Sequence, residues 1–245
     1  MRNQSEATPR RPALVLVPGL LCDEYVWQHQ VRHFAGSHRV VVPMLDRLDS
    51  IPAMASSLLA CEPGRFALAG HSLGGRIALE IVRQAPQRVA ALALLDTGVH
   101  PCSPGEPAKR QELLSLACTR GMDSVAREWL PPMVHPDRRD ERGFMAPLEA
   151  MVGRRTPASF GNQVKALIER PDATPVLAAI RCPTLVLCGR DDAWSPPAQH
   201  EAMAAAIPGA ALVMVENCGH MAPIERPAEV TRELELWLAA AGAVA

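Results

Sequence analysis

Short runs of apolar residues alternate along the chain with stretches in which apolar side chains recur every three or four positions. Continuous apolar runs are typical of strands buried on both faces of a parallel sheet, and the wider spacing is typical of amphipathic helices. The runs predict strands at Ala13–Val17, Arg39–Val42, Phe66–Ala69, Ala91–Leu95, Thr184–Cys188 and Ala211–Val215. The helical patterns span Trp27–Phe34, Ile51–Leu59, Leu73–Gln84, Pro197–Ala206 and Ala228–Ala240. This alternation predicts an α/β fold with a mostly parallel central sheet flanked by helices.

The alternation stops in the middle of the chain. Residues 98–179 are rich in proline, arginine and methionine, with helix-like pieces at Arg110–Ala117, Ser124–Leu130 and Ala146–Val152. We therefore expect a helical cap at 98–179, inserted into a core made of residues 1–97 and 180–245. Its larger apolar side chains fit either an apolar substrate pocket or the cap's own packing core. They are Met122, Met133, Met145, Met151, Trp129 and Phe144.

Ser72 stands in the sequence Gly70-His71-Ser72-Leu73-Gly74, between a predicted strand and a predicted helix. A serine at such a corner is held in a strained backbone conformation, and small neighbours let the turn close. This arrangement is a nucleophile elbow, which exposes the serine hydroxyl at the edge of the sheet. The first amide of the following helix, that of Leu73, is then free to donate to a developing oxyanion.

A serine nucleophile needs a base that takes its proton and an acid that orients the base. Asp191 and Asp192 follow the predicted strand Thr184–Cys188, and His220 follows the next predicted strand. Because the carboxyl ends of parallel strands meet at one edge of a sheet, we expect these side chains to converge on Ser72. Either aspartate can supply the acid, and Asp96, at the end of Ala91–Leu95, is a third candidate. For Asp96 we favour a role in bracing the entrance to the cap.

Composition narrows the function further. A chain of 245 residues, 48% of them hydrophobic, is long enough to bury a large core, and its formal charge of −1 gives no basic surface for nucleic acid or anionic membranes. Seven irregularly spaced cysteines indicate reduced thiols and a cytoplasmic protein. The polar segment Met1–Pro12 and the short run after it fit neither a signal peptide nor a membrane span.

Four segments together resemble the α/β-hydrolase superfamily. They are Val17-Pro18-Gly19-Leu20-Leu21, Gly70 to Gly75, Cys182 to Asp192, and Gly219-His220. Within the superfamily the chain looks most like small bacterial carboxylesterases and enol-lactone hydrolases, including the carboxylesterase of biotin synthesis. The resemblance implies an α/β-hydrolase fold with a helical cap, Ser72 as nucleophile, Asp192 as acid and His220 as base. It also implies an oxyanion hole made by the amides of Leu20 and Leu73.

The chain departs from this resemblance at two loops. Most relatives carry His-Gly where this chain has Pro18-Gly19, so a side chain that often braces the oxyanion loop is absent. The segment Pro43–Asp49 replaces a glycine-rich loop that borders the active site in relatives. The second departure weakens any inference about the substrate by analogy.

The sequence therefore predicts a serine hydrolase that cleaves a small carboxylic ester, thioester or lactone. A carbon–carbon bond hydrolase of ring-cleavage products and a non-enzymatic ligand receptor are the alternatives. We expect no cofactor and no metal; Cys22, Cys188 and Cys218 are interpreted as buried thiols. His71 is expected to pack or to form a hydrogen bond. The remaining histidines are expected to be solvated: His29, His33, His38, His100, His135 and His200.

Overall fold

Six parallel strands form one sheet in the computed structural model, which describes residues 11–242. The strand order is β2-β1-β3-β4-β5-β6. The bounds are β1 Ala13–Val17, β2 Arg39–Val41, β3 Phe66–His71, β4 Val89–Leu95, β5 Thr184–Gly189 and β6 Ala211–Val215. β1, β3 and β5 are buried along their whole length, whereas the edge strands β2 and β6 are partly exposed. The predicted α/β fold with a mostly parallel sheet is confirmed.

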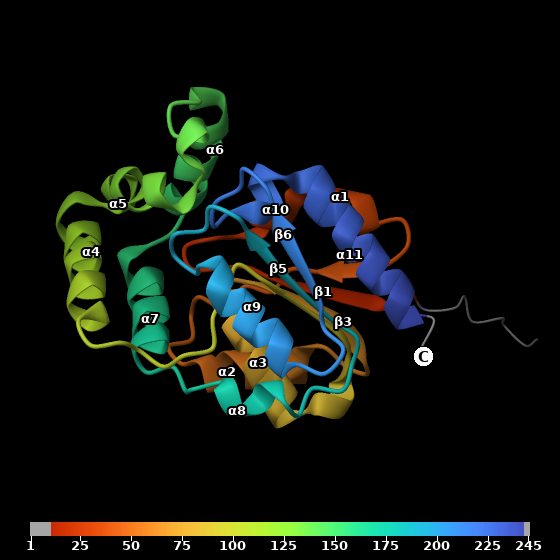
Figure 1. The fold of residues 1–245 in the computed structure, drawn as a ribbon. Helices are drawn as coiled ribbons and strands as arrows, with labels where there is room; N and C mark the ends of the chain where they lie inside the picture. The colour runs from red at the N-terminus through yellow and green to blue at the C-terminus, as the bar shows by residue number, and fades with distance from the viewer. Residues whose placement is uncertain (1–10, 243–245) are drawn as a thin grey trace, which may run out of the picture.

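Helices cover both faces of the sheet (Figure 1). On one face lie α1 (Gln28–Phe34), α10 (Ala222–Glu225) and α11 (Pro227–Gly242). On the other lie α2 (Ile51–Cys61), α3 (Leu73–Gln84), α8 (Thr174–Leu177) and α9 (Pro197–Ala206). Burial of apolar residues at helical spacing drives this packing, as in α11, which buries Val230, Leu234 and Trp237. The sheet is therefore enclosed on both faces, which is why its central strands are continuously apolar.

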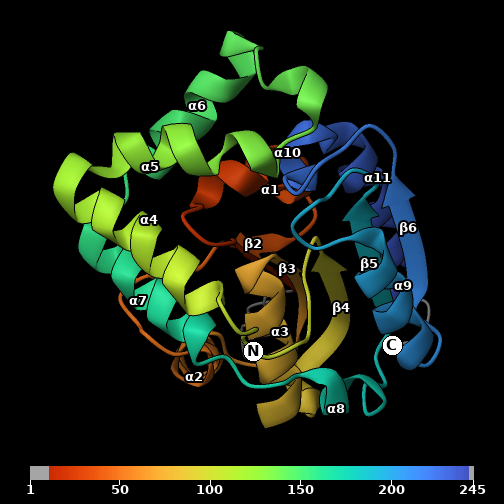
Figure 2. The same cartoon turned by 60° about the vertical axis from the view of Figure 1, so that its left-hand side comes forward.

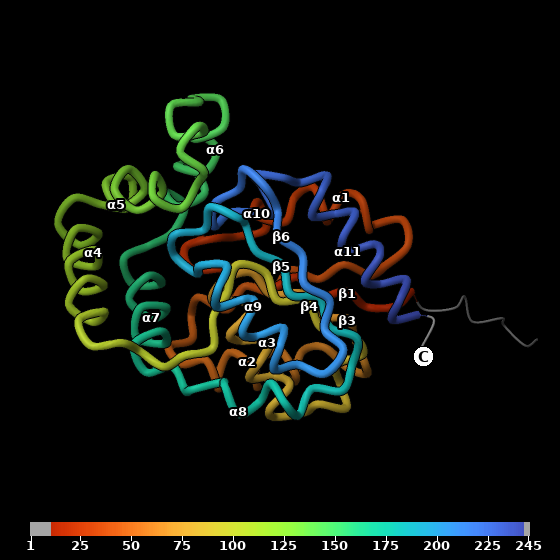
Figure 3. The backbone as a smooth tube through the Cα atoms, viewed as in Figure 1, coloured from red at the N-terminus to blue at the C-terminus, as the bar shows by residue number. Residues whose placement is uncertain are grey.

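Between β4 and β5 the chain forms four further helices that stand apart from the layers around the sheet (Figures 2 and 3). They are α4 (Glu106–Arg120), α5 (Met122–Trp129), α6 (Arg142–Gly153) and α7 (Pro157–Ile168). The three helix-like pieces of the sequence fall within α4, α5 and α6, or overlap their ends. α7 was not predicted, although Thr156 and Ser159 form a capping box at its start.

The order of the strands creates a crevice next to β1. After β1 the chain crosses to β2 at one edge, then returns to β3 on the other side of β1. The loops that leave β1 and β3 therefore run in opposite directions at neighbouring strand ends, and ligands of open α/β sheets bind at such a switch point. This topology places the loop after Val17 beside Ser72.

No helix within residues 11–242 is long and apolar enough to cross a membrane. All seven cysteines fall in the described part of the chain and carry free thiols. The polar segment Met1–Pro12, apart from its last two residues, lies outside the described residues.

Candidate active site

Ser72 occupies the tight corner between β3 and α3. Its backbone angles, φ 54° and ψ −115°, are strained for a residue with a side chain. The corner closes because its glycines leave room: a Cβ on Gly70 would lie 2.3 Å from the Gly74 carbonyl oxygen, and one on Gly74 2.1 Å from that of Val17. The local sequence thus forces the chain into a turn with Ser72 at its apex.

A continuous chain of hydrogen bonds leads away from Ser72. The Ser72 hydroxyl lies 2.8 Å from His220 Nε2, and His220 Nδ1 lies 2.8 Å from Asp192 Oδ2. The other Asp192 oxygen accepts from the amides of Trp194 and Ser195, each at 2.8 Å. Both His220 and Asp192 are buried. Loops at the carboxyl ends of β3, β5 and β6 supply these three side chains, which lie as far as 148 residues apart in the chain.

Asp191 does not take part in this chain. Its carboxylate is partly exposed and lies 3.5 Å from His135 Nε2, on the loop between α5 and α6. The sequence leaves open which of these two aspartates is the acid. In the structure it is Asp192 that contacts His220.

The surroundings of Asp192 favour its ionised form. Burial by itself raises the pKa of this carboxyl, but the charge and hydrogen bond of His220 and the two backbone amides outweigh it and hold the pKa below its usual value. An ionised carboxylate only accepts hydrogen bonds, so His220 Nδ1 carries the proton. The Nε2 atom of His220 is then free to accept from Ser72.

Asp96 braces the site without touching His220. Its two carboxylate oxygens accept from the amides of Gly189, at 2.9 Å, and Ala222, at 3.2 Å. Burial, followed by the nearby charge of Asp192, raises its pKa. The expected role at the entrance to the cap is therefore corrected: Asp96 ties the end of β5 to the start of α10, and so supports the loops of both Asp192 and His220.

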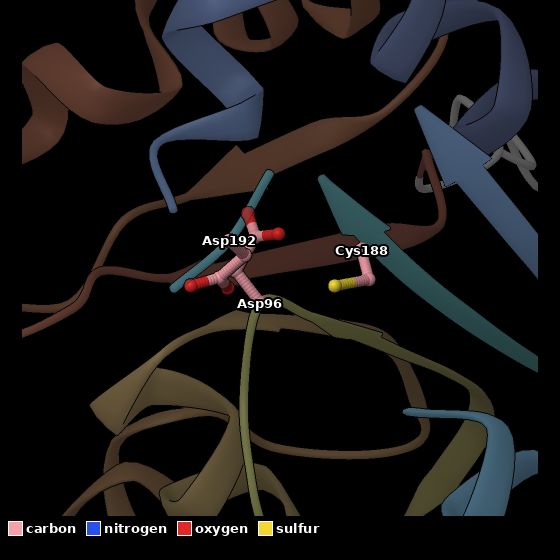
Figure 4. A group of neighbouring side chains, drawn as sticks. All are labelled: Asp96, Cys188 and Asp192. Atoms are coloured by element: carbon pink, nitrogen blue, oxygen red, sulfur yellow. The ribbon is translucent and has the colours of Figure 1, made fainter. Parts of the chain in front are cut away.

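Asp96, Cys188 and Asp192 converge at the ends of β4 and β5 (Figure 4), and their donor atoms lie within 4.8 Å of one another. These atoms already have other partners: the carboxylates accept the hydrogen bonds given above, and the thiol of Cys188 lies 3.1 Å from the Gly189 carbonyl oxygen. Burial, followed by the charges of both aspartates, raises the pKa of this thiol, whereas metal ligation needs a thiolate. The group fits a hydrogen-bonded support better than a metal centre.

Two buried side chains hold the loop that carries His220. The Nε2–H of His71 donates to the His220 carbonyl oxygen at 2.7 Å, and burial lowers the pKa of His71 to about 3. Glu225 accepts from the amides of Gly219, Met221 and His135. The hydrogen-bonding role expected for His71 is thus present. Glu225 was not singled out from the sequence, where nothing distinguishes it from the other acidic residues.

One expectation about the histidines is wrong. His200 is fully buried rather than solvated. Its Nε2 atom accepts a hydrogen bond from the Thr97 amide at 2.9 Å, so the buried ring has a polar partner. Thr97 in turn donates from its hydroxyl to the Ser72 carbonyl oxygen at 2.6 Å. Burial lowers the pKa of His200 to about 4, which keeps its ring neutral. The polar sequence around His200 gave no sign of this contact across the fold.

The two amides expected to form an oxyanion hole lie beside Ser72. Leu73 is the first residue of α3, so its N–H has no partner within the helix. Leu20 lies on the loop after β1, at the switch point. Within residues 11–242, neither amide donates a hydrogen bond to another protein group. Both are therefore available to an oxygen atom placed above Ser72.

Ser72 and His220 open into a cavity of about 550 Å³ between the sheet and the helices α4, α5 and α7. One wall is apolar, with Leu113, Trp129, Phe160, Val164 and Leu167. Of the six side chains expected as pocket or core, Trp129 lines this cavity and Phe144 does not. The four methionines do not line it either and are buried elsewhere.

The cavity is also lined by cationic side chains. Among residues 11–242 these are Arg76, Lys109, Arg110 and Arg170, and the one carboxylate that lines it is that of Glu106. Arg110 and Arg170 both donate to Glu106. Burial alone raises the pKa of Glu106, but these hydrogen bonds outweigh it and hold the pKa at about 2.

Arg76 has no carboxylate partner within the described residues; its guanidinium donates to the His100 carbonyl oxygen at 2.9 Å. Burial, followed by the charge of Arg170, lowers the pKa of Arg76 to about 9. Arg76 lies in the first turn of α3, four residues after Ser72, and both residues line the same cavity. That spacing could have singled it out from the sequence.

A sequence profile described as "Alpha/beta hydrolase family" matches residues 14–233, which is most of the chain. The chain belongs to the alpha/beta hydrolase family. The superfamily resemblance drawn from the sequence motifs is thereby confirmed.

Three known proteins illustrate the similarity. The alpha/beta hydrolase chain is 27% identical over 235 residues to a pimeloyl-[acyl-carrier protein] methyl ester esterase of Nitrosomonas europaea, covering 88% of this chain and 91% of that protein. It is 30% identical to a thermophilic esterase from Thermogutta terrifontis whose structure has malate bound, with a TM-score of 0.89 and 96% of each chain covered. An enol-lactonase from Burkholderia xenovorans shares the fold, at 23% identity and a TM-score of 0.83, with 94% of this chain and 92% of that chain covered.

Proposed function

We propose that this protein is a serine hydrolase that cleaves a small carboxylic ester, thioester or lactone through an acyl-enzyme on Ser72. The observation that carries the proposal is the hydrogen-bonded chain from Ser72 through His220 to Asp192, which opens into a cavity of about 550 Å³. Its esterase relatives in the family support the choice of an ester bond.

In the proposed reaction, His220 Nε2 takes the proton of Ser72 while the serine oxygen attacks the acyl carbon. The amides of Leu20 and Leu73 stabilise the negative charge that develops on the carbonyl oxygen. His220 then gives its proton to the departing alcohol, thiol or hydroxyl oxygen of the lactone. In the second half, His220 takes a proton from water, which attacks the acyl-enzyme and releases the acid and free Ser72. Asp192 keeps the ring of His220 oriented throughout.

We further propose that the substrate carries a carboxylate or another anionic group. Four cationic side chains and one carboxylate line the cavity that contains Ser72, and Arg76 has no carboxylate partner among residues 11–242. A half-buried guanidinium is strongly attracted to an anion in a pocket shielded from water. The esterase from Thermogutta terrifontis, which binds the dicarboxylate malate in its structure, supports this choice. The apolar residues of the cavity would then contact the uncharged part of the substrate.

The charge requirement is tested with Arg76→Met on two esters of equal length, one ending in a methyl group and one in a carboxylate. We expect kcat/KM for the carboxylate ester to fall roughly 10- to 100-fold, because a charged hydrogen bond contributes about 1.5–3 kcal/mol. The neutral ester should change by less than about threefold. Arg127→Met, on the exposed side of α5 and outside the cavity, is the matched control for lost positive charge. Equal losses on both esters would contradict the anionic substrate.

The proposed reaction is tested first by steady-state hydrolysis of p-nitrophenyl esters from acetate to decanoate. We expect turnover with an optimum at short or medium acyl chains, since a cavity of about 550 Å³ holds a small molecule. The proposal would be contradicted if the folded protein hydrolysed none of these esters, no lactone and no ester that carries a carboxylate. Turnover of a vinylogous diketone instead would favour carbon–carbon bond hydrolysis.

We propose residues 98–179 as the cap that completes this cavity. The cap supplies all five apolar residues named above and every cationic residue of the cavity except Arg76. We also propose a cytoplasmic location, for which the seven free thiols are the supporting observation.

A further inference from the structure

The loop after β1 is held by a side chain from a distant helix. The buried amide of Leu21 donates to Gln163 Oε1 at 3.0 Å, across 142 residues of sequence. Gln163 lies on α7, which follows α4, α5 and α6 in the chain, and is itself buried. No other side-chain hydrogen bond reaches the backbone of residues 18–22 within the described part of the chain.

The backbone conformation of the loop after β1 needs support from its surroundings. Leu21 has φ 60°, in the left-handed region that a branched apolar residue rarely adopts. Such a conformation costs on the order of 1 kcal/mol or more and persists only when its surroundings fix it. Cys22 closes the turn by donating to the Gly19 carbonyl oxygen at 3.2 Å. Pro18, at the start of the loop, offers neither an N–H nor a polar side chain.

We propose that Gln163 is a positioning residue for the oxyanion hole, supplying from the cap the brace that the loop lacks at Pro18. The inference rests on the proposed function. The hydrogen bond fixes the peptide plane between Leu20 and Leu21, which is joined at the Leu20 Cα to the peptide plane that carries the Leu20 N–H. Gln163 has no place in the cavity above Ser72, so it acts through Leu21 and does not touch the reacting atoms.

A second contact strengthens the connection between this loop and the helices. Asp23, just after the loop, accepts from Arg154 and Arg155, which lie between α6 and α7. The turn between α6 and α7 and the middle of α7 therefore both contact residues 21–23. These contacts couple the position of α7 to the conformation of the loop after β1.

The decisive variant is Gln163→Met, which keeps the volume of the side chain and removes its acceptor. We expect kcat to fall roughly 10- to 100-fold with KM within about threefold, since complete loss of an oxyanion donor costs about 10²–10³ in kcat. Asn162→Leu is the matched control: the neighbouring side chain also ties α7 to the core, by donating to the Asp46 carbonyl oxygen at 3.2 Å, but does not reach the oxyanion loop. It should retain kcat within about threefold.

A second readout separates this inference from the proposed function. An alkyl fluorophosphonate reacts with an activated serine: the bond from Ser72 Oγ to phosphorus forms, fluoride leaves, and the serine proton passes to His220. Its phosphoryl oxygen occupies the oxyanion hole, so we expect Gln163→Met to be labelled about 10- to 100-fold more slowly than wild type.

The outcomes are distinct. Slower labelling and lower kcat in Gln163→Met, but not in Asn162→Leu, support the inference. Equal rates in Gln163→Met and wild type overturn it and leave the serine hydrolase intact. A folded wild type that is not labelled at Ser72 overturns both. Should Gln163→Met fail to fold, Gln163→Asn, which is one methylene too short to reach Leu21, carries the same expectation.

Discussion

Ser72→Ala is expected to lower kcat by roughly 10⁴- to 10⁶-fold, because the proposed acyl-enzyme cannot form without the serine oxygen. The hydrogen bond between Ser72 and His220 makes this the side chain on which the whole reaction depends. The measurement is steady-state hydrolysis by wild type and variant on the best ester of the series, with the KM of each determined separately.

Ser103→Ala is the matched control for this substitution. Ser103 lines the same cavity, but its hydroxyl lies 3.4 Å from the Glu106 carboxylate instead of facing a histidine ring. It should keep kcat within a few-fold of wild type. If Ser72→Ala retained most of its activity at unchanged melting temperature, the nucleophile would have to be sought elsewhere.

Asp192→Asn is expected to lower kcat by roughly 10³- to 10⁴-fold, because an amide can donate to His220 Nδ1 and so stabilise the wrong tautomer of the ring. The neighbouring Asp191→Asn, whose carboxylate lies near His135, should change kcat by less than about threefold. The two aspartates are neighbours in the chain but differ in burial and in the partner of the carboxylate.

The opposite pattern, a large loss in Asp191→Asn and none in Asp192→Asn, would show that the acid has been assigned to the wrong aspartate. Asp96→Asn completes the series. It changes a support of the loops rather than a partner of His220, so its main effect should be a lower melting temperature.

The sheet was the most predictable part of this protein. All six strands lie where the apolar runs place them, because strands covered by helices on both faces are apolar along most of their length and the partly exposed edge strands are still rich in valine. Their ends were less accurate: β4 begins at Val89 and β3 continues to His71. These extensions depend on pairing with the neighbouring strand, which the residues themselves do not reveal.

The helix α7 and the surroundings of the site were harder to predict for a shared reason. α7 contains Gly161, Asn162 and Gln163 in succession, and such a polar stretch weakens a helical pattern. The same Gln163 acquires its role only through contact with Leu21, and His200 only through contact with Thr97. Motifs with a fixed local geometry, such as the turn at Ser72, can be recognised within a few residues. Contacts between distant segments cannot.

The chain order of the site has a consequence for synthesis on the ribosome. Ser72 and the amides proposed for the oxyanion hole lie within residues 20–73, whereas His220 follows Ser72 by 148 residues. During synthesis, β1 and β3 therefore leave the ribosome long before the imidazole does. We expect Ser72 to have the ordinary reactivity of an alcohol until the segment with His220 has been made and has placed its ring beside the turn. A chain truncated before His220 is expected to show no hydrolysis, however much of the sheet it retains.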